Sequence, residues 1–400
     1  MRLEGERGAD VARRRFGIGV VLGASAVLVM GCNPPNPASA GNGEQLRVLV
    51  DRAVADNEHV PAAALCLLSP ARGLEWSGAA GLADPERGET MTADRPVRIA
   101  SNTKTYVAAT VLRLSEEGLL GLDDPIASHL TDRQVRLLTS DGYDPEKIKV
   151  RHLLTHTSGL FDHSDSQKYG DAILAEPTRE WTRDEQLEAA VAWGDPWGEP
   201  GEIYTYCDTG YVLLGGIIEE ASGKPMAAAV REFLHLDHIG LTSTWWEILE
   251  QAPRGVPDRA HQFIDEADVH GFSPSFDLFG GGGIVATVGD MARFYQALFT
   301  GRVFSDPATL DLMLTTVEGA RARPDADETA LAPGAYRMGL WVMEIEGLTA
   351  YAHTGFWGTA VAYVPELDLA IAATVNQNKA KEAMWELVEG SVSVAAGARP

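Results

Sequence analysis

The chain has 400 residues, of which 45% are apolar and 22% are charged, so it can bury a substantial core and is too apolar to be disordered. Its net charge of -24 makes nucleic-acid backbones and anionic lipid headgroups unfavourable partners for the folded part. We therefore expect one large globular domain or two ordinary ones, with no nucleic-acid partner.

The first 31 residues predict an export signal. Three arginines at 13–15 precede an apolar run over 16–30, which is short for a membrane span and suits the hydrophobic region of a signal peptide. The run ends in Val-Met-Gly-Cys at 29–32, which resembles the lipobox of bacterial lipoproteins, although Met30 is not the usual small residue. The arginines also resemble a twin-arginine signal. A simple cleaved secretory peptide is the alternative.

On this interpretation residues 1–31 are removed and Cys32 is lipidated as the new N-terminus. The stretch 32–43 has no apolar face and predicts a flexible tether. The protein is then expected to be a membrane-anchored lipoprotein of the periplasm or cell envelope. The folded domain is expected over 44–395.

Hydrophobic periodicity predicts helices and strands along that domain. The helices are expected over 44–55, 101–118, 148–159, 181–193, 211–221, 226–234 and 379–392, and the strands over 61–68, 74–81, 339–345, 350–353, 359–364 and 369–375. Strands at both ends with helices between them predict an α+β fold, in which an antiparallel sheet is built from both chain ends. The sheet part is expected at about 44–98 and 330–395, and a large, mainly helical insertion at about 99–329.

Ser101 and Lys104 stand one turn apart at the start of the predicted helix 101–118, so the hydroxyl and the amine share one face. A serine is a weak nucleophile until a neighbour takes its proton, and a lysine desolvated in a pocket can be neutral enough to help. The pair predicts a nucleophilic serine with a lysine partner. Because Ser-x-x-Lys also arises by chance, it needs support elsewhere in the chain.

Two further segments give that support. Tyr206 and Asp208 lie in a turn-rich loop before the predicted helix 211–221, where a tyrosine can shuttle a proton. Asp208 could instead cap that helix. The run His353-Thr354-Gly355 lies in a strand-like segment, and Gly355 would permit close approach of a ligand.

In this order and at these separations, Ser101-x-x-Lys104, Tyr206-x-Asp208 and His353-Thr354-Gly355 resemble the motifs of the serine β-lactamase and penicillin-binding superfamily. The nearer likeness is to its branch of class C β-lactamases, D-alanyl-D-alanine carboxypeptidases, D-aminopeptidases and related esterases. The stretches 152–160, 211–219 and 281–287 resemble that branch too. The resemblance covers about residues 44–395 and implies a β-lactamase/transpeptidase-like fold.

The resemblance also implies a role for each motif residue. Ser101 would attack a carbonyl and form an acyl-enzyme, and Lys104 would accept or share its proton. Tyr206 would pass that proton to the leaving group and later activate water. The backbone N–H groups of Ser101 and Phe356 would form the oxyanion hole. Asp208 and the run His353-Thr354-Gly355 would line the substrate side.

Two positions depart from the best-known motifs. Asp208 stands where many relatives have Asn, and a carboxylate near Lys104 favours the ammonium form, so Tyr206 would carry more of the proton transfer. His353 stands where class C β-lactamases usually have Lys, and a mostly neutral histidine attracts a substrate carboxylate less. Both departures favour an ester, an amide or a D-amino-acid peptide over a β-lactam.

Other chemistries are expected to be absent. His152 and His156 have helical spacing but lack the further ligands of a zinc site, so they predict structural hydrogen bonds, with no metal and no cofactor. Cys66 and Cys207 are expected to be free and buried rather than joined. We expect a serine hydrolase acting on a small molecule or peptide. The alternatives are a β-lactamase and a non-catalytic lipoprotein that binds cell-wall peptide.

Overall fold

The computed structural model describes residues 37–317, 319–323 and 335–397, so the predicted signal 1–31 and Cys32 lie outside the described residues. Its helices are α1 Pro37–Ala55, α2 Thr103–Glu116, α3 Asp132–Ser140, α4 Val150–Leu154, α5 Gln167–Ala175, α6 Arg183–Trp193, α7 Asp208–Ser222, α8 Met226–Phe233, α9 Leu236–Ile239, α10 Val288–Phe299, α11 Pro307–Met313 and α12 Lys381–Ala396. Its strands are β1 Ala62–Ser69, β2 Leu74–Asp84, β3 Glu89–Thr90, β4 Val97–Arg98, β5 Ile203–Tyr204, β6 Thr244–Trp246, β7 Phe263–Ile264, β8 Ala267–Asp268, β9 Ile284–Ala286, β10 Arg321–Ala322, β11 Trp341–Ile345, β12 Leu348–Gly355, β13 Thr359–Val364 and β14 Leu369–Thr374.

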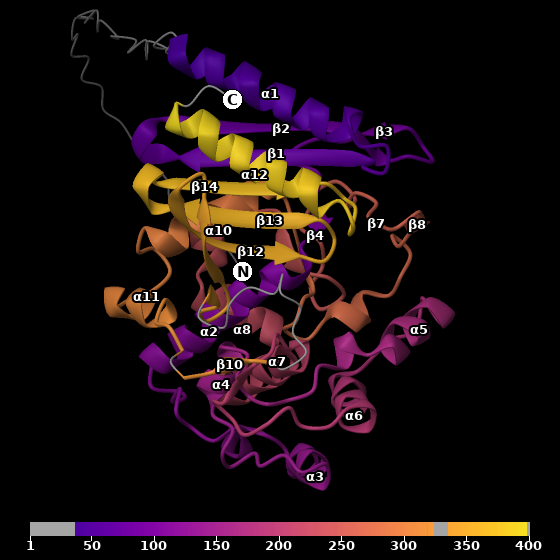
Figure 1. Ribbon diagram of the computed structural model, residues 1–400, viewed down its shortest axis with the longest axis vertical. Helices are drawn as coiled ribbons and strands as arrows, with labels where there is room; N and C mark the ends of the chain where they lie inside the picture. Colours follow the sequence, from indigo (N-terminus) through magenta and orange to yellow (C-terminus); the bar gives the residue numbers. More distant parts are fainter. Residues whose placement is uncertain (1–36, 318, 324–334, 398–400) are drawn as a thin grey trace, which may run out of the picture. The chain divides into compact units, whose positions relative to one another are not determined.

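A seven-stranded sheet joins segments from the two ends of the chain (Figure 1). Its order is β11-β12-β13-β14-β1-β2-β3, and β1 pairs antiparallel with β14 at its centre. Hydrogen bonds between β1 and β14 therefore bring residues more than 300 positions apart into one sheet, with Ala64 opposite Thr374. The predicted α+β class and the sheet built from both ends are confirmed.

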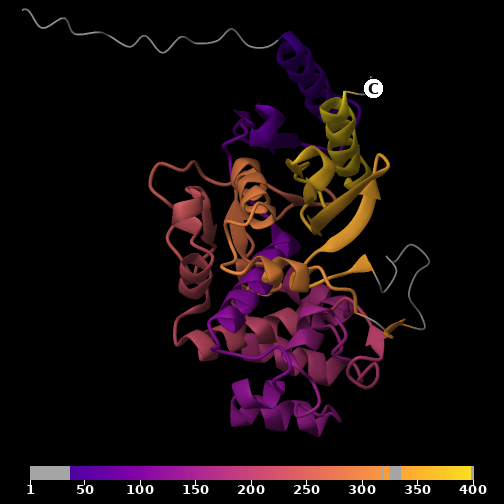
Figure 2. The ribbon, with the colours of Figure 1, turned by 90° about the vertical axis from the view of Figure 1, so that its left-hand side faces the viewer.

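The side chains of the sheet enter two separate apolar cores, because successive residues of a strand point to opposite faces. In β1, Ala63, Leu65 and Leu67 join the core beneath α1 and α12, and Ala62, Ala64 and Cys66 join the core shared with the helical part. Figure 2 shows α1 and α12 side by side, and these two helices contact each other and the sheet. Helix α10 packs on the opposite face, against β1 and β14.

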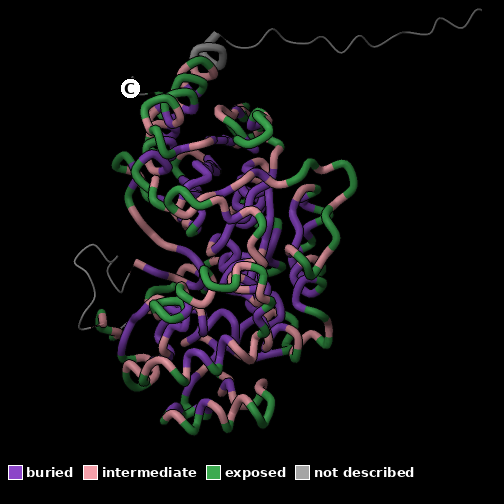
Figure 3. The backbone as a smooth tube through the Cα atoms, turned by 90° about the vertical axis from the view of Figure 1, so that its right-hand side faces the viewer, coloured by how far each residue is buried: buried purple, intermediate pink, exposed green. Residues whose placement is uncertain are grey.

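Helix α2 lies at the centre of the helical part. It is buried continuously from Thr103 to Leu114, with α7, α8 and α11 packed around it. Figure 3 shows buried stretches of the chain gathered in the interior, with exposed stretches at the periphery. A helix that is enclosed on all sides tolerates little movement, so its N-terminal end is a rigid platform. That end carries the predicted nucleophile.

Two predicted helix boundaries were wrong. Helix α1 begins at Pro37 rather than at residue 44, so the part 37–43 of the predicted tether is helical; proline suits the first turn of a helix because its φ is already fixed. Helix α4 ends at Leu154 instead of continuing to residue 159, because the chain turns sharply at His156, which has a φ of 56°. The middle of the chain also contains strands, including the small sheet β4-β9-β6.

Cys66 and Cys207 are both buried and form no disulfide, as predicted. Burial raises the pKa of the Cys66 thiol to about 12, which keeps it protonated and unreactive. In the part of the chain that the structure describes, no helix is both long enough and apolar enough to cross a membrane.

Candidate active site

Ser101 lies in a short 3-10 turn, Ala100–Asn102, that leads directly into α2. Ala100 has a φ of 45°, in the left-handed region that a residue with a Cβ enters only when its surroundings hold it there. The Asn102 amide holds the turn, since it donates to Ile99 O at 3.0 Å and to Thr359 Oγ1 at 2.8 Å. Strand β13 thereby fixes the position of the serine.

Gly355 lies at the end of β12, directly against this turn. A Cβ on Gly355 would meet Ile99 O at 2.2 Å and Thr359 Oγ1 at 2.3 Å, closer than atoms can approach. The expectation that Gly355 makes room for a ligand was therefore incomplete, because the close neighbour is the protein itself. The glycine lets β12 pack against the segment that carries Ser101.

Lys104 is fully buried and occupies the first turn of α2. Its Nζ lies 2.9 Å from Ser101 Oγ, 2.7 Å from Gly281 O and 2.6 Å from Asp208 Oδ1. An ammonium has three N–H groups, and here three acceptors surround it, so the geometry suits a charged lysine. The turn at 280–283 lies beside the site and supplies one of these acceptors.

Tyr206 lies next to Ser101, and the interaction of its phenol with the serine side chain partly offsets the rise in the pKa of Tyr206. Lys104 Nζ is 5.0 Å from the centre of its ring, and the ring of Trp341 stacks on it with the ring centres 6.2 Å apart. Burial raises the pKa of Tyr206 well above its ordinary value, and the negative charge of Asp208 raises it further. The phenol is therefore held in its neutral form.

His156 binds the chain on both sides of Tyr206. Its backbone oxygen accepts from Thr205 N at 3.0 Å and its Nδ1 accepts from Cys207 N at 3.1 Å. Its ring lies 4.3 Å from that of Tyr206, centre to centre. Burial lowers the pKa of His156 well below its usual value, so the neutral ring that can accept at Nδ1 is favoured. The structural role predicted for this histidine is confirmed.

Asp208 is the first residue of α7. The N-cap position before it is Cys207, whose side chain makes no capping hydrogen bond to the helix. The Asp208 carboxylate faces Lys104 instead, so the capping alternative is wrong. Burial raises the pKa of Asp208, but the Lys104 ammonium outweighs burial and holds the pKa below its usual range. Asp162 Oδ2 accepts the backbone N–H of Asp208 at 2.9 Å, and burial together with the Asp208 charge raises the pKa of Asp162 to about 7.

His353 is buried in β12, with 1% of its surface exposed. Its Nδ1 lies 2.8 Å from Thr354 O, and its Nε2 lies 3.3 Å from the hydroxyl of Tyr336. This arrangement suits a neutral ring that donates from Nδ1 and accepts at Nε2. Burial, reinforced by the Lys104 charge, lowers the pKa of His353 to about 3, so the site has no cation at this position.

A cavity of about 830 Å³ opens onto Ser101. Its lining includes Tyr206, Asp208, Thr354 and Phe356, and Phe356 is half exposed at 50%. A volume of this size suits a small-molecule or short-peptide substrate. Of the eight positions predicted from the three motifs and the residue after the third, the buried Lys104 does not line this cavity. The other seven line it: Ser101, Tyr206, Asp208, His353, Thr354, Gly355 and Phe356.

Sequence reasoning missed part of the lining. Asp162 and Asp277 come from the loops 161–200 and 242–280, in which no motif had been found. Tyr169, which lies in α5, also lines the cavity. The sequence favours a role for the segments 161–200 and 242–280 in substrate choice, but no motif in them singles out these residues.

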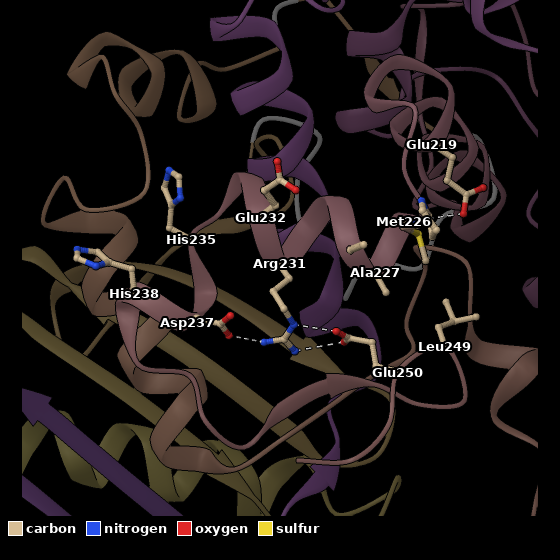
Figure 4. A pocket seen from close by; sticks show the side chains of 12 residues that line it. Glu219, Met226, Ala227, Arg231, Glu232, His235, Asp237, His238, Leu249 and Glu250 are labelled. Carbon is tan, nitrogen blue, oxygen red and sulfur yellow. Dashed lines mark hydrogen bonds and ion pairs between the residues drawn. The ribbon is translucent and has the colours of Figure 1, made fainter. Parts of the chain in front are cut away.

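A second cavity, of about 700 Å³, lies along α8 and is not lined by Ser101. Figure 4 shows Arg231 in it, held by Glu250 and Asp237, each at 2.8 Å. Its central charges are thus paired with one another, and its lining contains no serine or cysteine nucleophile. We therefore assign the site to the cavity at Ser101.

The family model described as Beta-lactamase matches residues 49–389. Among curated proteins, the chain is 38% identical to Esterase EstB of Burkholderia gladioli over 38% of this chain and 39% of that protein. It is 26% identical to Penicillin-binding protein 4 of Amycolatopsis lactamdurans over 87% of this chain and 89% of that protein. Over the first curated relatives the match spans less than half of their length, with 47% for Penicillin-binding protein 4* of Bacillus subtilis.

Solved structures have the same fold. D-amino acid amidase from Ochrobactrum anthropi SV3, complexed with D-phenylalanine, superposes with a TM-score of 0.73 at 24% identity, over 90% of this chain and 100% of that chain. A D-stereospecific amidohydrolase from Streptomyces sp. has a TM-score of 0.70 at 25% identity, over 87% of this chain and 98% of that chain. With the family match across most of its length and the three motifs gathered at one serine, the chain belongs to the Beta-lactamase family of the serine β-lactamase and penicillin-binding superfamily.

Proposed function

We propose that this protein is a serine hydrolase that forms an acyl-enzyme on Ser101 and transfers the acyl group to water. The observation that carries the proposal is the contact of 2.9 Å between Lys104 Nζ and Ser101 Oγ at the wall of the cavity. We propose an ester, an amide or a D-amino-acid peptide as the substrate. The names of the relatives, an esterase and D-amino acid amidases among them, support this range.

The charge states of the site favour a proton relay in which Tyr206 receives one proton as it gives up another, so that the phenol stays neutral. As Ser101 Oγ bonds to the substrate carbonyl carbon, its proton passes to the phenol oxygen of Tyr206, and the phenol proton passes to the leaving group as that bond breaks. No tyrosinate forms, in keeping with the raised pKa of Tyr206. The Lys104 ammonium stabilises the negative charge that develops on Ser101 Oγ.

Deacylation repeats the relay in reverse. A water attacks the acyl carbon, gives its proton to Tyr206, and the Tyr206 proton returns to Ser101 Oγ as the acyl bond breaks. We assign the oxyanion hole to the backbone N–H groups of Ser101 and Phe356, which both line the cavity. These two donors would stabilise the tetrahedral intermediate in both half-reactions.

A fluorophosphonate probe tests the proposal, because it reacts with activated serines. We expect covalent labelling of the wild type at Ser101 and none in Ser101→Ala. Ser164→Ala is the matched control, since Ser164 lines the same cavity but bonds to Asp162 and Asp208 rather than to Lys104. Labelling that persists in Ser101→Ala, or a folded wild type that is not labelled, would contradict the proposal.

A non-catalytic binder of cell-wall peptide is the second candidate. It is favoured by one observation, the full set of acceptors around Lys104, which keeps that group from acting as a base. This candidate predicts stoichiometric acylation without release of product. Multiple turnovers of any ester or peptide per Ser101 exclude it.

We further propose that the protein is exported and anchored through a lipid on Cys32. The lipobox-like sequence 29–32 supports this proposal. In the native host, metabolic labelling with an alkyne palmitate should mark the wild type and not Cys32→Ser. Equal labelling of both proteins, or release of both into the soluble fraction, would contradict it.

A further inference from the structure

The cavity at Ser101 is acidic. Four aspartates line it, namely Asp162, Asp165, Asp208 and Asp277. Among its described lining residues Lys381 is the one basic side chain, and it is exposed at the start of α12. Since His353 is neutral, a substrate carboxylate would find little attraction in this cleft and considerable repulsion.

Three of the four aspartates already have partners. Asp208 pairs with Lys104 at 2.6 Å, and Asp165 pairs with Arg323 at 3.1 Å. Asp162 accepts the backbone N–H of Asp208 at 2.9 Å and both the N–H and the hydroxyl of Ser164 at 3.0 Å. These carboxylates are held by the protein itself.

Asp277 differs from the other three. It ends the short 3-10 turn Pro274–Asp277, and no lysine or arginine of the described chain forms an ion pair with it. Its one close donor is the indole N–H of Trp357, which favours the charged form but makes no well-aligned hydrogen bond. Trp357 is fully buried, so its N–H is a polar group left without a well-aligned partner. The Asp277 carboxyl is partly exposed and lines the wall of the cavity.

The charges around Asp277 do not fully compensate its negative charge. Burial and the negative charge of Asp208 raise its pKa to about 7, while Lys104 and Arg98 oppose this only in part. Both of these cations are engaged elsewhere, Lys104 as described and Arg98 with Glu247 at 2.6 Å. A cation entering the cavity would relieve the repulsion between Asp277 and Asp208.

The walls near Asp277 are aromatic. Phe276 precedes it in the same turn and packs edge to face on Trp357, with ring centres 6.0 Å apart, and Phe356 packs on Trp357 at 4.9 Å. All three rings line the cavity. Aromatic faces beside a carboxylate are the surroundings in which proteins bind ammonium groups, through cation–π attraction and ion pairing together.

We propose that Asp277 is a specificity-determining residue that binds the cationic ammonium group of an amphipathic substrate, whose apolar part lies against Phe276 and Phe356. The proposal rests on the proposed function, because it names the substrate class of the same site. The preferred substrates are then amino-acyl esters or amides with a free amine, and compounds that carry a carboxylate in its place are poor ligands.

Three small inhibitors with the same phenylethyl body test the proposal. They are 2-phenylethylammonium, 2-phenylethanol and 3-phenylpropanoate, which end in a cation, a neutral group and an anion. Each is assayed as a competitive inhibitor of p-nitrophenyl butyrate hydrolysis at about pH 8, where Asp277 is ionised because its pKa is about 7. We expect the inhibition constant of the ammonium compound to be about tenfold below that of the alcohol, with the carboxylate weakest.

In Asp277→Asn the inhibition constant of the alcohol should exceed that of the ammonium compound by only about threefold or less. Asp165→Asn is the matched control, since Asp165 lines the same cavity and is paired with Arg323, and it should keep most of the ratio. A wild type that binds the alcohol or the carboxylate as tightly as the ammonium compound overturns the proposal, as does a folded Asp277→Asn with an unchanged ratio. If Asp277→Asn does not fold, the order of the three inhibitors in the wild type decides.

Failure of the proposed function is distinguishable from failure of the ammonium-binding proposal. If the wild type does not hydrolyse p-nitrophenyl butyrate, or Ser101→Ala hydrolyses it equally well, the enzymatic proposal is lost. Calorimetric binding of the same three compounds to the wild type then still decides whether the cleft prefers a cation.

Discussion

The Nζ atom of Lys104 lies 2.6 Å from Asp208 Oδ1 and 2.9 Å from Ser101 Oγ, so one ammonium group joins the acid of the second motif to the nucleophile of the first. Asp208→Ala should therefore slow acylation by a fluorophosphonate roughly 100-fold or more, because removing one partner of a buried pair leaves the other charge uncompensated. Asp208→Asn should lose less, since its amide oxygen can still accept from Lys104. Equal acylation rates in Asp208→Ala and the wild type would show that this pair does not hold Lys104 in place.

His156 should matter for activity although it does not line the cavity. His156→Ala removes the acceptor of the Cys207 N–H and the ring that supports Tyr206, so kcat should fall roughly tenfold or more while KM changes little. His152→Ala is the control from the same segment, since His152 Nδ1 accepts only from Lys149 N, far from the phenol. Similar losses in both variants would indicate a general effect of the segment rather than positioning of Tyr206.

Gly355→Ala should destabilise the protein and disturb the serine turn. The added methyl group would meet Ile99 O at 2.2 Å, which forces β12 away from the segment of Ser101. Such overpacking costs about 3 kcal/mol, measured as a loss in the free energy of unfolding by urea. Gly271→Ala, where a Cβ meets nothing within 4 Å, should stay within about 0.5 kcal/mol of the wild type. A Gly355→Ala variant as stable as Gly271→Ala would refute the close packing.

Esters should be hydrolysed faster than cephalosporins. The β-lactam carboxylate meets a neutral His353, whose pKa is about 3, and the acidic groups Asp208 and Asp277. We expect kcat/KM for p-nitrophenyl butyrate to exceed that for a chromogenic cephalosporin by about 100-fold. Rapid turnover of the cephalosporin would reverse this order and favour a β-lactamase.

The stability of the protein should depend on pH through Asp277. Its pKa is raised from 3.8 to about 7 in the fold, chiefly by burial and by Asp208, so the folded state holds this proton more tightly than the unfolded chain does. Its contribution to stability is therefore lost as pH rises from about 4 to 7. Asp277→Asn should raise Tm by about 2 °C or more at pH 8 and by little near pH 4. A gain of equal size at both pH values would show that ionisation of Asp277 is not the cause.

The three motifs and the sheet were predictable from the sequence because their signals are local. The Ser101 and Lys104 spacing follows from helix geometry, and the apolar runs of β1 and β14 follow from burial on both faces of the sheet. The turn at His156 was missed because it depends on bonds to Thr205 and Cys207, some 50 residues away.

The acidic wall of the cavity was not predictable for the same reason. Asp277 packs against Gly282, where a Cβ would lie 2.2 Å from its carboxylate, and the neighbouring Gly281 lies against Asp208, a residue more than 70 positions earlier. The packing of Gly355 against Ile99 was likewise not predictable, since the two residues lie more than 250 positions apart. Contacts between distant segments leave no periodic signal in the sequence.

The central claim is that Ser101 carries the acyl group between the two half-reactions. Its most direct test is peptide mapping by mass spectrometry after rapid acid quench of the wild type during turnover of p-nitrophenyl butyrate. The account predicts a butyryl group on the peptide that contains Ser101, formed within the first turnover and absent in Ser101→Ala. An acyl group on any other residue, or full ester turnover by Ser101→Ala, would contradict it.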